Sequence, residues 1–304
     1  MSTPKTILMT GATGFLGSNI LKLLLLQSYK VLVVKRASSN TERIKEVLSS
    51  PHLILYNLDD GFGLEDLFKK HRVDVIVHTA TVYGRLSEST LDIVKSNLLL
   101  PLRLLELAVA HKTPCFINTD TFSSEDIELL GKEKQYVKTK KDFVTYAKEI
   151  IADTPVTFVN LVIEQMYGPT DNPTKFIPFV IKEMLKNSPT VSFTPGQQKR
   201  DFIFVEDCAQ AYLSVIKHLS ALDRFEEFGI GTGMAHPLKS AVTEIKSMLK
   251  SVSQLRWGAL PYRENEIMEH CADISRNKKI AWKAETSFKE GMRKTIGYYR
   301  HTSV

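Results

Sequence analysis

The sequence predicts an α/β protein whose larger part is a doubly wound parallel sheet and whose smaller part mixes helices with short strands. An apolar run over residues 6–10 ends in three glycines, Gly11, Gly14 and Gly17, and helical periodicity follows at once. Buried strands and helices then alternate as far as residue 163, which is typical of parallel sheets with right-handed crossovers. After Glu164 this alternation stops. We therefore expect a Rossmann-like fold followed by a smaller mixed α/β part.

The glycine-rich turn predicts a site for a pyrophosphate. Glycine adopts backbone angles that a Cβ atom resists, and it lets a ligand approach the main chain closely. The N–H groups and the positive dipole end of the following helix attract an anion. A βα turn that binds no ligand is the alternative, because the spacing differs from Gly-x-Gly-x-x-Gly. In the ligand-binding interpretation, the residues that contact the cofactor are Gly11, Thr13, Gly14, Phe15, Leu16 and Gly17.

The second strand, over residues 31–34, ends at Lys35-Arg36, and this end indicates which dinucleotide binds. In dinucleotide folds an acidic residue at this place holds the ribose 2′-hydroxyl of NAD. Two cations stand here instead and would bind a 2′-phosphate, so we predict NADPH; a solvated basic loop is the alternative. One charge-assisted hydrogen bond contributes about 1.5–3 kcal/mol, which gives a roughly tenfold to hundredfold preference. Asn57 and Leu58, which end the third strand, are expected beside the adenine.

The rest of the first part continues the alternation of strand and helix. Small residues after the fourth strand, Thr79, Ala80 and Thr81, would let a cofactor lie across the strand ends. Pro101 predicts a kink in a long helix, and Ser39 or Asn40 is expected to cap a short one. The expected helices cover residues 41–48, 64–71, 91–111 and 133–151, and the further expected strands cover 52–58, 74–78, 115–118 and 156–163.

A turn-rich segment, residues 167–173, separates this part from the second one. The predicted domains are residues 1–164, to which parts of 200–232 return, and residues 165–304, which bind the substrate. In the second domain we expect helices near residues 175–186, 206–218, 236–251 and 288–299, and strands near 191–193 and 201–205.

Composition and charge exclude several classes of protein. A hydrophobic content of 43% with 24% charged residues is ordinary for a globular protein, and no apolar run approaches the roughly 20 residues of a membrane span. The net charge of +6 arises from scattered clusters, a distribution that does not favour nucleic-acid binding. Neither the three cysteines nor the eight histidines have the spacing of metal ligands. We therefore expect a cytoplasmic protein that binds no metal, membrane or nucleic acid.

Tyr136 and Lys140 are four residues apart and share one face of a predicted helix. A free phenol titrates near pH 10, and a neighbouring ammonium stabilises the phenolate, which makes a tyrosine usable as an acid or base. Thr119 ends the fifth strand just before this helix, where its hydroxyl could share a substrate oxygen with the tyrosine. A solvated helix face is the alternative interpretation of the Tyr–Lys pair taken alone.

These motifs together resemble the extended short-chain dehydrogenase/reductases that act on nucleotide sugars, over essentially the whole chain. The residues that carry the resemblance are Gly11-x-x-Gly14-x-x-Gly17, Thr119, Tyr136-x-x-x-Lys140, Tyr167-Gly168-Pro169, Gln198-x-Arg200-Asp201-Phe202, and Arg263 before Cys271-Ala272-Asp273. The resemblance is greatest to members that use NADPH to reduce the C4 ketone of CDP-4-keto-3,6-dideoxy-D-glucose. Such members form either configuration at C4, and the sequence leaves both open.

The resemblance also implies roles for individual residues. Tyr136 would donate a proton to O4 of the sugar, Lys140 would hold the nicotinamide ribose, and Thr119 would hydrogen-bond to the carbonyl. Arg200 and Arg263 would bind the diphosphate, which suits a permanently charged, two-pronged donor. Further substrate contacts are expected from Tyr83, Thr121, Gln165 and Lys175. Family members often pair the helices equivalent to residues 91–111 and 133–151, so a homodimer is expected.

Two departures from the family pattern bear on the reaction. Asp120 is followed by Thr121, so the Asp-Glu pair of the dehydratases is absent and a dehydratase is disfavoured. Val162 stands where many relatives have an arginine, and the segment between Thr119 and Tyr136 is shorter than in many of them. A nucleotide-sugar 4-epimerase with retained NAD is an alternative, which Lys35-Arg36 disfavour. A non-catalytic dinucleotide sensor is a second alternative, which the Tyr136–Lys140 pair disfavours.

Overall fold

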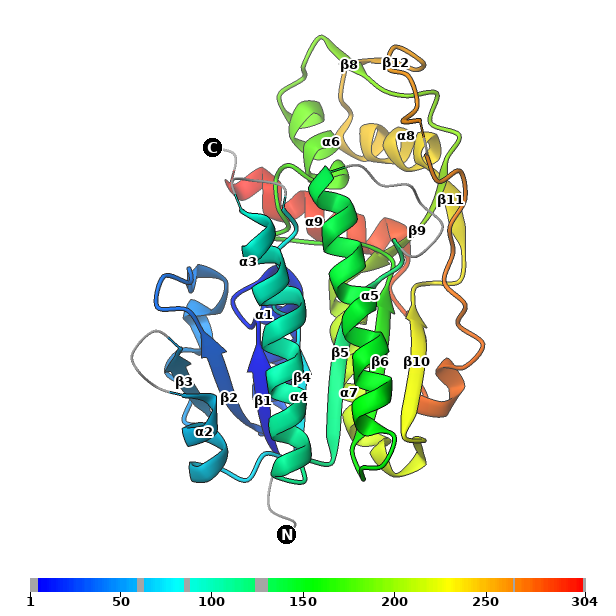
Figure 1. Cartoon of the computed structure of the whole chain (residues 1–304). Helices are drawn as coiled ribbons and strands as arrows, with labels where there is room; N and C mark the ends of the chain where they lie inside the picture. The colour runs from blue at the N-terminus through cyan, green and yellow to red at the C-terminus, as the bar shows by residue number, and fades with distance from the viewer. Residues whose placement is uncertain (1–4, 59–62, 85–87, 124–130, 265, 303–304) are drawn as a thin grey trace. The chain divides into compact units, whose positions relative to one another are not determined.

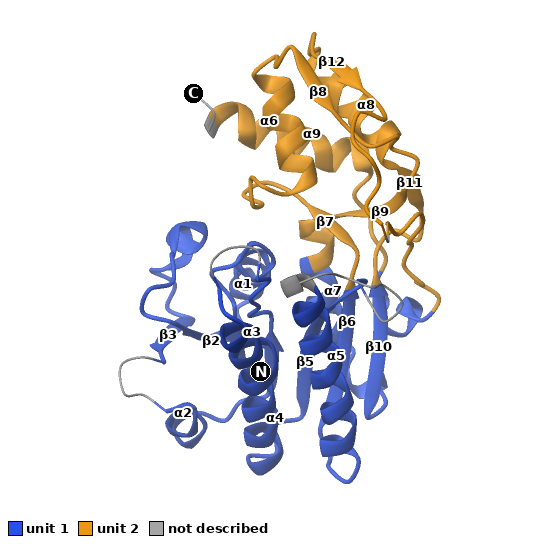
Figure 2. Ribbon diagram, turned by 45° about the horizontal axis from the view of Figure 1, so that its top comes forward, with its two compact units in different colours: residues 1–162, 209–229, 276–282 blue, residues 163–208, 230–275, 283–304 orange. Residues whose placement is uncertain are grey.

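The structure, a computed structural model, describes residues 5–58, 63–84, 88–123, 131–264 and 266–302. The chain divides into two compact units, coloured blue and orange in Figure 2. Unit 1 comprises residues 1–162, 209–229 and 276–282, and unit 2 comprises residues 163–208, 230–275 and 283–304. The chain therefore passes between the units several times.

Unit 1 is built on a seven-stranded sheet with the strand order β10-β6-β5-β4-β1-β2-β3. β1 pairs in parallel with both β2 and β4, so the strand order reverses beside β1, where doubly wound sheets bind ligands. This arrangement confirms the predicted Rossmann-like fold. The strands are β1 (Thr6–Thr10), β2 (Lys30–Lys35), β3 (Leu53–Asn57), β4 (Val75–His78), β5 (Cys115–Thr121), β6 (Thr157–Ile163) and β10 (Phe225–Ile230).

Helices cover the sheet because its strands are apolar on both faces. Leu8, Leu32, Ile76 and Phe116 point to one face and form a core with helix residues such as Phe143. α4 and α5 lie side by side over the sheet (Figure 1). The helices of this part of the chain are α1 (Phe15–Leu26), η1 (Glu42–Val47), α2 (Leu64–Lys70), α3 (Thr90–Val94), η2 (Lys95–Leu99), α4 (Leu100–Ala110), α5 (Gly131–Ile151), α7 (Val205–Lys217), η3 (Leu219–Ala221) and η4 (Asn277–Ile280).

Two predictions about these helices need correction in detail. The helix expected over 91–111 is α3 and α4 joined by the π-helical turn η2, with Pro101 in the first turn of α4. Proline has no N–H to bond to the carbonyl four residues earlier, and a π turn accommodates that loss. The helix expected over 41–48 is the shorter 3₁₀ helix η1, where Asn40 Oδ1 accepts the N–H of Glu42 at 2.8 Å.

The described residues of unit 2 form two small sheets and three helices around a core of their own. A three-stranded sheet has the order β11-β9-β7, and β8 pairs with β12. Buried residues of this core include Tyr167, Phe202, Val242 and Met292. The strands are β7 (Gln165–Tyr167), β8 (Thr190–Ser192), β9 (Lys199–Phe204), β11 (Ala235–Pro237) and β12 (Gln254–Arg256), and the helices are α6 (Phe176–Leu185), α8 (Leu238–Leu249) and α9 (Phe288–Thr302).

Candidate active site

The glycine turn joins β1 to α1 by a path that only glycine permits. Gly11 has a φ of +72°, and a Cβ atom on it would lie 2.4 Å from the backbone nitrogen of Ala80. A Cβ atom on Gly17 would lie 2.2 Å from the carbonyl oxygen of Gly11. The N-cap of α1 is Gly14, which has no side chain to cap the helix, and the first turn contains no acidic residue. The positive end of α1 is therefore suited to an anion such as a pyrophosphate.

Hydrogen bonds hold the segment after β4, residues 79–82, next to this turn. Thr79 Oγ1 donates to the carbonyl oxygen of Thr10 at 2.8 Å. Thr81 Oγ1 donates to Asn97 Oδ1 at 3.2 Å, and Asn97 Nδ2 donates to the carbonyl oxygen of Val82 at 2.9 Å. Asn97 is buried in η2, and the sequence reasoning missed it. The one sign of its importance in the sequence is that a polar residue directly precedes three leucines, residues 98–100.

The four residues predicted around the adenine and its ribose lie together at the ends of β2 and β3. Lys35 and Asn57 are register partners, and the N–H of Leu58 donates to the carbonyl oxygen of Lys35 at 3.0 Å. Lys35 Nζ donates to the carbonyl oxygen of Arg36 at 3.3 Å, and the Arg36 side chain is exposed. The two basic residues thus stand beside the strand ends at which an NADP 2′-phosphate is expected.

The predicted catalytic residues also lie together in unit 1. Lys140 Nζ lies 5.8 Å from the centroid of the Tyr136 ring and donates to the carbonyl oxygen of Thr119 at 2.6 Å. Lys140 is only 6% exposed, and this burial lowers its pKa, against which the charge of Asp120 acts. The Tyr83 ring packs against Tyr136 with a centroid separation of 4.9 Å. α5, β5 and the segment after β4 therefore converge on one phenol and one ammonium.

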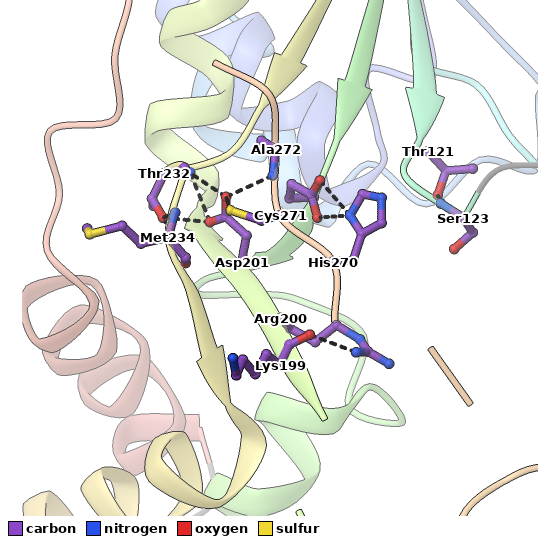
Figure 3. A network of polar contacts seen from close by, with 12 residues as sticks. Thr121, Ser123, Lys199, Arg200, Asp201, Thr232, Met234, His270, Cys271 and Ala272 are labelled. Atoms are coloured by element: carbon purple, nitrogen blue, oxygen red, sulfur yellow. Dashed lines mark hydrogen bonds and ion pairs between the residues drawn. The ribbon is translucent and has the colours of Figure 1, made fainter. Parts of the chain in front are cut away.

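Two threonines end β5 on the same face, and their hydroxyls have different partners. Thr119 Oγ1 donates to the carbonyl oxygen of His78 at 2.8 Å and lies 2.7 Å from the Tyr212 hydroxyl. Thr121 Oγ1 accepts the N–H of Ser123 at 3.3 Å; both residues are labelled in Figure 3. Tyr212 comes from α7, and the sequence reasoning missed its contact with Thr119 because 93 residues separate the two.

Asp120 lies on the opposite face of β5 from both threonines. Its carboxylate accepts Asn160 Nδ2 at 3.0 Å and the N–H of Thr121 at 2.8 Å, and Lys141 Nζ lies 3.8 Å from it. The side chain of Asp120 is fully buried. Asp120 is therefore part of a buried polar network with structural partners. This agrees with the sequence, in which Thr121 follows Asp120 and the Asp-Glu pair of the dehydratases is absent.

In unit 2, the residues predicted to bind substrate lie at several places. Arg200, on β9, donates to Glu266 Oε1 and to the carbonyl oxygen of Lys199, and burial lowers its pKa. Gln165 pairs in register with Phe202 of the same sheet. Arg263 is exposed, and its charge contributes to the lowered pKa of Arg200. Lys175 precedes α6 and pairs with Asp171 at 3.0 Å.

Asp201, next to Arg200, organises the loops of unit 2. It is completely buried and accepts the N–H groups of Thr232, Gly233 and Ala272 at 2.9, 2.9 and 3.3 Å (Figure 3). The Thr232 hydroxyl donates to the same carboxylate at 2.6 Å. Asp201 therefore fixes residues 232–233 and 271–272 against β9. The sequence showed the Arg-Asp-Phe motif without showing this role.

A second buried carboxylate lies in the same unit. Glu164, which follows β6, lies 3.0 Å from His270 Nδ1. Burial raises the pKa of Glu164, and the hydrogen bond from His270 opposes that shift.

Within the described ranges, no group of three or more His, Cys, Asp or Glu side chains could hold a metal ion. Among the same residues, no helix has the length and apolar character needed to cross a membrane.

Comparisons with known proteins agree with this arrangement. The model of the NAD dependent epimerase/dehydratase family matches residues 7–231. The chain is 36% identical over 297 residues to a CDP-abequose synthase of Salmonella muenchen, covering 96% of this chain and 97% of that protein. It is 30% identical over 294 residues to a CDP-abequose synthase of Salmonella typhimurium, covering 95% and 97%.

A solved structure shares the fold. The UDP-glucose 4-epimerase of Thermotoga maritima with UDP-glucose matches with a TM-score of 0.83 and 22% identity, over 98% of this chain and 100% of that one. The chain therefore belongs to the NAD dependent epimerase/dehydratase family of extended short-chain dehydrogenase/reductases, and it is an enzyme that acts on nucleotide sugars.

Proposed function

We propose that the protein reduces the C4 ketone of CDP-4-keto-3,6-dideoxy-D-glucose to CDP-abequose with NADPH, a step of O-antigen dideoxysugar synthesis. The observation that carries the proposal is the buried Lys140 ammonium beside the Tyr136 ring. The identity of 36% to a CDP-abequose synthase supports the substrate. The missing Asp-Glu pair at Asp120-Thr121 supports a reductase over a dehydratase.

The chain's own residues would hold the cofactor and move the proton. The glycine turn, with the uncapped N-terminus of α1, fits a pyrophosphate, and Lys140 would hold the nicotinamide ribose. NADPH, when bound, supplies the hydride. Tyr136 would donate a proton to O4 of the sugar, and the adjacent ammonium favours the phenolate that remains. The Thr119 hydroxyl at the end of β5 would hydrogen-bond to the ketone oxygen.

Lys35 and Arg36 support NADPH over NADH. No acidic residue stands at the end of β2, where one would hold the 2′-hydroxyl of NAD, and Arg36 is exposed. A guanidinium binds two phosphate oxygens at once. The proposed cofactor site further includes Thr13, Phe15, Leu16, Asn57, Leu58, Thr79, Ala80 and Thr81.

The diphosphate of the substrate would bind to Arg200 and Arg263. Arg200 is paired with Glu266 at 2.8 Å, so a phosphate at Arg200 would have to share the guanidinium with that carboxylate or replace it. The proposed substrate contacts further include Tyr83, Thr121, Gln165 and Lys175.

We also propose that the enzyme is cytoplasmic and forms a homodimer through α4 and α5. The exposed side chains of Leu99 and Tyr146 are on these adjoining helical segments.

Two further reactions are alternatives within the same family. Reduction to the opposite C4 configuration would make the protein a CDP-paratose synthase. A 4-epimerase would use the same Tyr–Lys pair, and the fold shared with a UDP-glucose 4-epimerase is compatible with it. Lys35 and Arg36 at the end of β2 disfavour the tightly bound NAD that an epimerase needs. A non-catalytic sensor would have no use for the pair Tyr136–Lys140.

Replacement of Tyr136 by phenylalanine tests the proposed mechanism. The wild-type protein should oxidise NADPH when CDP-4-keto-3,6-dideoxy-D-glucose is present, and Tyr136→Phe should lower kcat by about 10²–10⁴-fold, because the proton donor is lost. Binding of NADPH, followed by its fluorescence, should be unchanged. Tyr146→Phe is the matched control, since Tyr146 is on the same helix and 49% exposed. Full turnover by Tyr136→Phe would contradict the mechanism.

A further inference from the structure

The side chain of Tyr136 has more than one orientation open to it. Tyr136 lies on α5, and in a helix the χ1 angle of a tyrosine takes values of about 180° or about −60°. A change between these values moves the hydroxyl at the far end of the ring. Proton transfer needs this hydroxyl within reach of the reacting oxygen, and a misplacement of about 1 Å can slow a reaction about 100-fold. A residue that selects one orientation of Tyr136 would therefore affect the rate.

Lys140 marks the place that the phenol has to occupy. Its Nζ donates to the carbonyl oxygen of Thr119 at 2.6 Å and its side chain is buried, so the ammonium is held by contacts of its own. This ammonium lies 5.8 Å from the centroid of the Tyr136 ring. In the proposed mechanism it stabilises the phenolate, so the ring has to stay next to a fixed charge.

The ring of Tyr83 packs against the ring of Tyr136. The two centroids are 4.9 Å apart and the ring planes make an angle of 35°, which is a favourable arrangement for an aromatic pair. Tyr83 comes from the loop after β4 and not from α5, so the contact joins the phenol to a second part of the chain. Tyr83 is 36% exposed, so the protein covers most of its surface. The contact limits the space in which the Tyr136 ring can turn.

Hydrogen bonds connect the backbone next to Tyr83 to the backbone of Tyr136. The N–H of Val82 donates to Asn97 Oδ1 at 2.8 Å, and Asn97 Nδ2 donates to the carbonyl oxygen of Val82 at 2.9 Å. Asn97 Nδ2 also donates to Thr139 Oγ1 at 3.4 Å, and that hydroxyl donates to the carbonyl oxygen of Tyr136 at 3.0 Å. Asn97 and Thr139 are both buried. The two aromatic rings therefore project from backbone segments that are held in register with each other.

We infer that Tyr83 is a positioning residue for Tyr136, because its ring holds the phenol in the orientation that lies beside Lys140. The inference rests on the proposed function, in which Tyr83 is otherwise a substrate contact. The two roles need different atoms: positioning needs the aromatic ring of Tyr83, whereas a hydrogen bond to the substrate needs its hydroxyl.

Two variants of Tyr83 separate the ring from the hydroxyl. Tyr83→Leu removes the ring, and it should lower the single-turnover rate of hydride transfer by about 10–100-fold while KM for the sugar and the Kd of NADPH stay within about 3-fold. Tyr83→Phe keeps the ring, and all three values should stay within about 3-fold of wild type. An equal loss of rate in Tyr83→Phe would overturn the inference, because the hydroxyl would then be the group that acts.

A double-mutant cycle with Tyr136→Phe tests whether Tyr83 acts through the phenol. In the Tyr136→Phe background there is no phenolic proton to position, so Tyr83→Leu should change the residual rate by less than about 2-fold. A loss of the same size in both backgrounds would overturn the inference, because Tyr83 would then act on the substrate directly. The melting temperature of Tyr83→Leu should fall by about 1–6 °C, which shows that the variant folds.

The orientation of Tyr136 can also be measured without any reaction. In protein with isotope-labelled tyrosine, three-bond NMR couplings from the backbone to Cγ report the χ1 angle, and Tyr136→Phe assigns the resonance. Wild type and Tyr83→Phe should show one χ1 value, and Tyr83→Leu an average over two. A single χ1 value in Tyr83→Leu would overturn the inference whether or not the protein reduces the ketosugar. Failure of the wild-type protein to reduce it would overturn the proposed function, and the couplings would still decide the positioning role.

Discussion

His78 shows how one buried residue can couple pH to the stability of the nucleotide-binding unit. Its ring is 2% exposed and hydrogen-bonds to Thr10 Oγ1 at 2.8 Å. Burial, aided by the charge of Lys140, lowers the pKa of His78 from 6.5 to about 3. The folded protein therefore keeps His78 neutral at pH values at which the unfolded chain has already bound a proton.

This pKa difference predicts a loss of stability in acid. The unfolded state binds the extra proton below about pH 6.5, so the free energy of unfolding should fall as the pH falls from 6.5 toward 3. The contribution of His78 is about 1.4 kcal/mol per pH unit. Urea unfolding measured at pH 7, 6 and 5 gives the slope. His78→Asn, which has no imidazole, is the control, and parallel curves for the two proteins would contradict the prediction.

At the same scale, the sequence could predict that Tyr136 and Lys140 lie close together, but not the residues that surround them. Tyr136 and Lys140 are four residues apart on one helix, so their proximity is visible in the sequence. Tyr212 contacts Thr119 across 93 residues and Asn97 contacts Thr139 across 42, so local spacing contains no trace of either contact.

Among the elements, the glycine turn between β1 and α1 imposes the strictest requirement on the sequence. Gly17→Ala would place a Cβ atom 2.2 Å from the Gly11 carbonyl oxygen and 2.8 Å from Thr79 Oγ1. Backbone has to move to relieve the first contact, and the turn that is proposed to hold the pyrophosphate moves with it.

We therefore expect Gly17→Ala to weaken NADPH binding by more than tenfold and to lower the melting temperature. Titration of NADPH fluorescence and thermal unfolding give the two values. Gly297→Ala is the control, because a Cβ atom at this helical glycine meets nothing within 4 Å and alanine favours a helix by up to about 1 kcal/mol. An NADPH affinity of Gly17→Ala equal to that of wild type would contradict the account of the turn.

The elements that the sequence predicted are those with a clear hydrophobic period. β1, β2 and β4 are apolar runs between turns, and the structure contains each of them. β7, β11 and β12 have three residues each, too few to show any period. Prediction from pattern therefore succeeded for every strand of the large sheet except β10 and was incomplete in unit 2.

β10 (Phe225–Ile230) was not predicted, for a different reason. Its sequence contains Glu226, which is completely buried although it is an acid. Arg276 Nη2 lies 2.5 Å from this carboxylate, and Lys279 also pairs with it. A buried charge is tolerated where such partners neutralise it. Because both partners come from residues at least 50 positions away, the local pattern does not suggest a strand.

At the scale of the whole molecule, the two units contain different parts of the proposed chemistry. Unit 1 contains the glycine turn, Lys35-Arg36 and the Tyr136–Lys140 pair, and unit 2 contains Arg200, Arg263 and the Asp201 centre. The sequence predicts these residues in two different parts, because the motifs lie on either side of Glu164. The return of residues 276–282 to unit 1 could not be predicted, because it depends on contacts with β10. One of these is the hydrogen bond from Asn277 Nδ2 to the carbonyl oxygen of Gly229.

The product of the reaction tests the central claim most directly. The protein is incubated with NADPH and CDP-4-keto-3,6-dideoxy-D-glucose, with NADH in a parallel sample, and the configuration at C4 of the product is determined by NMR. We predict oxidation of NADPH in step with product formation, slower reaction with NADH, and an axial 4-hydroxyl, as in CDP-abequose. An equatorial hydroxyl would instead identify CDP-paratose. Neither product nor oxidised cofactor would contradict the claim that this protein is a ketoreductase of a CDP-linked dideoxysugar.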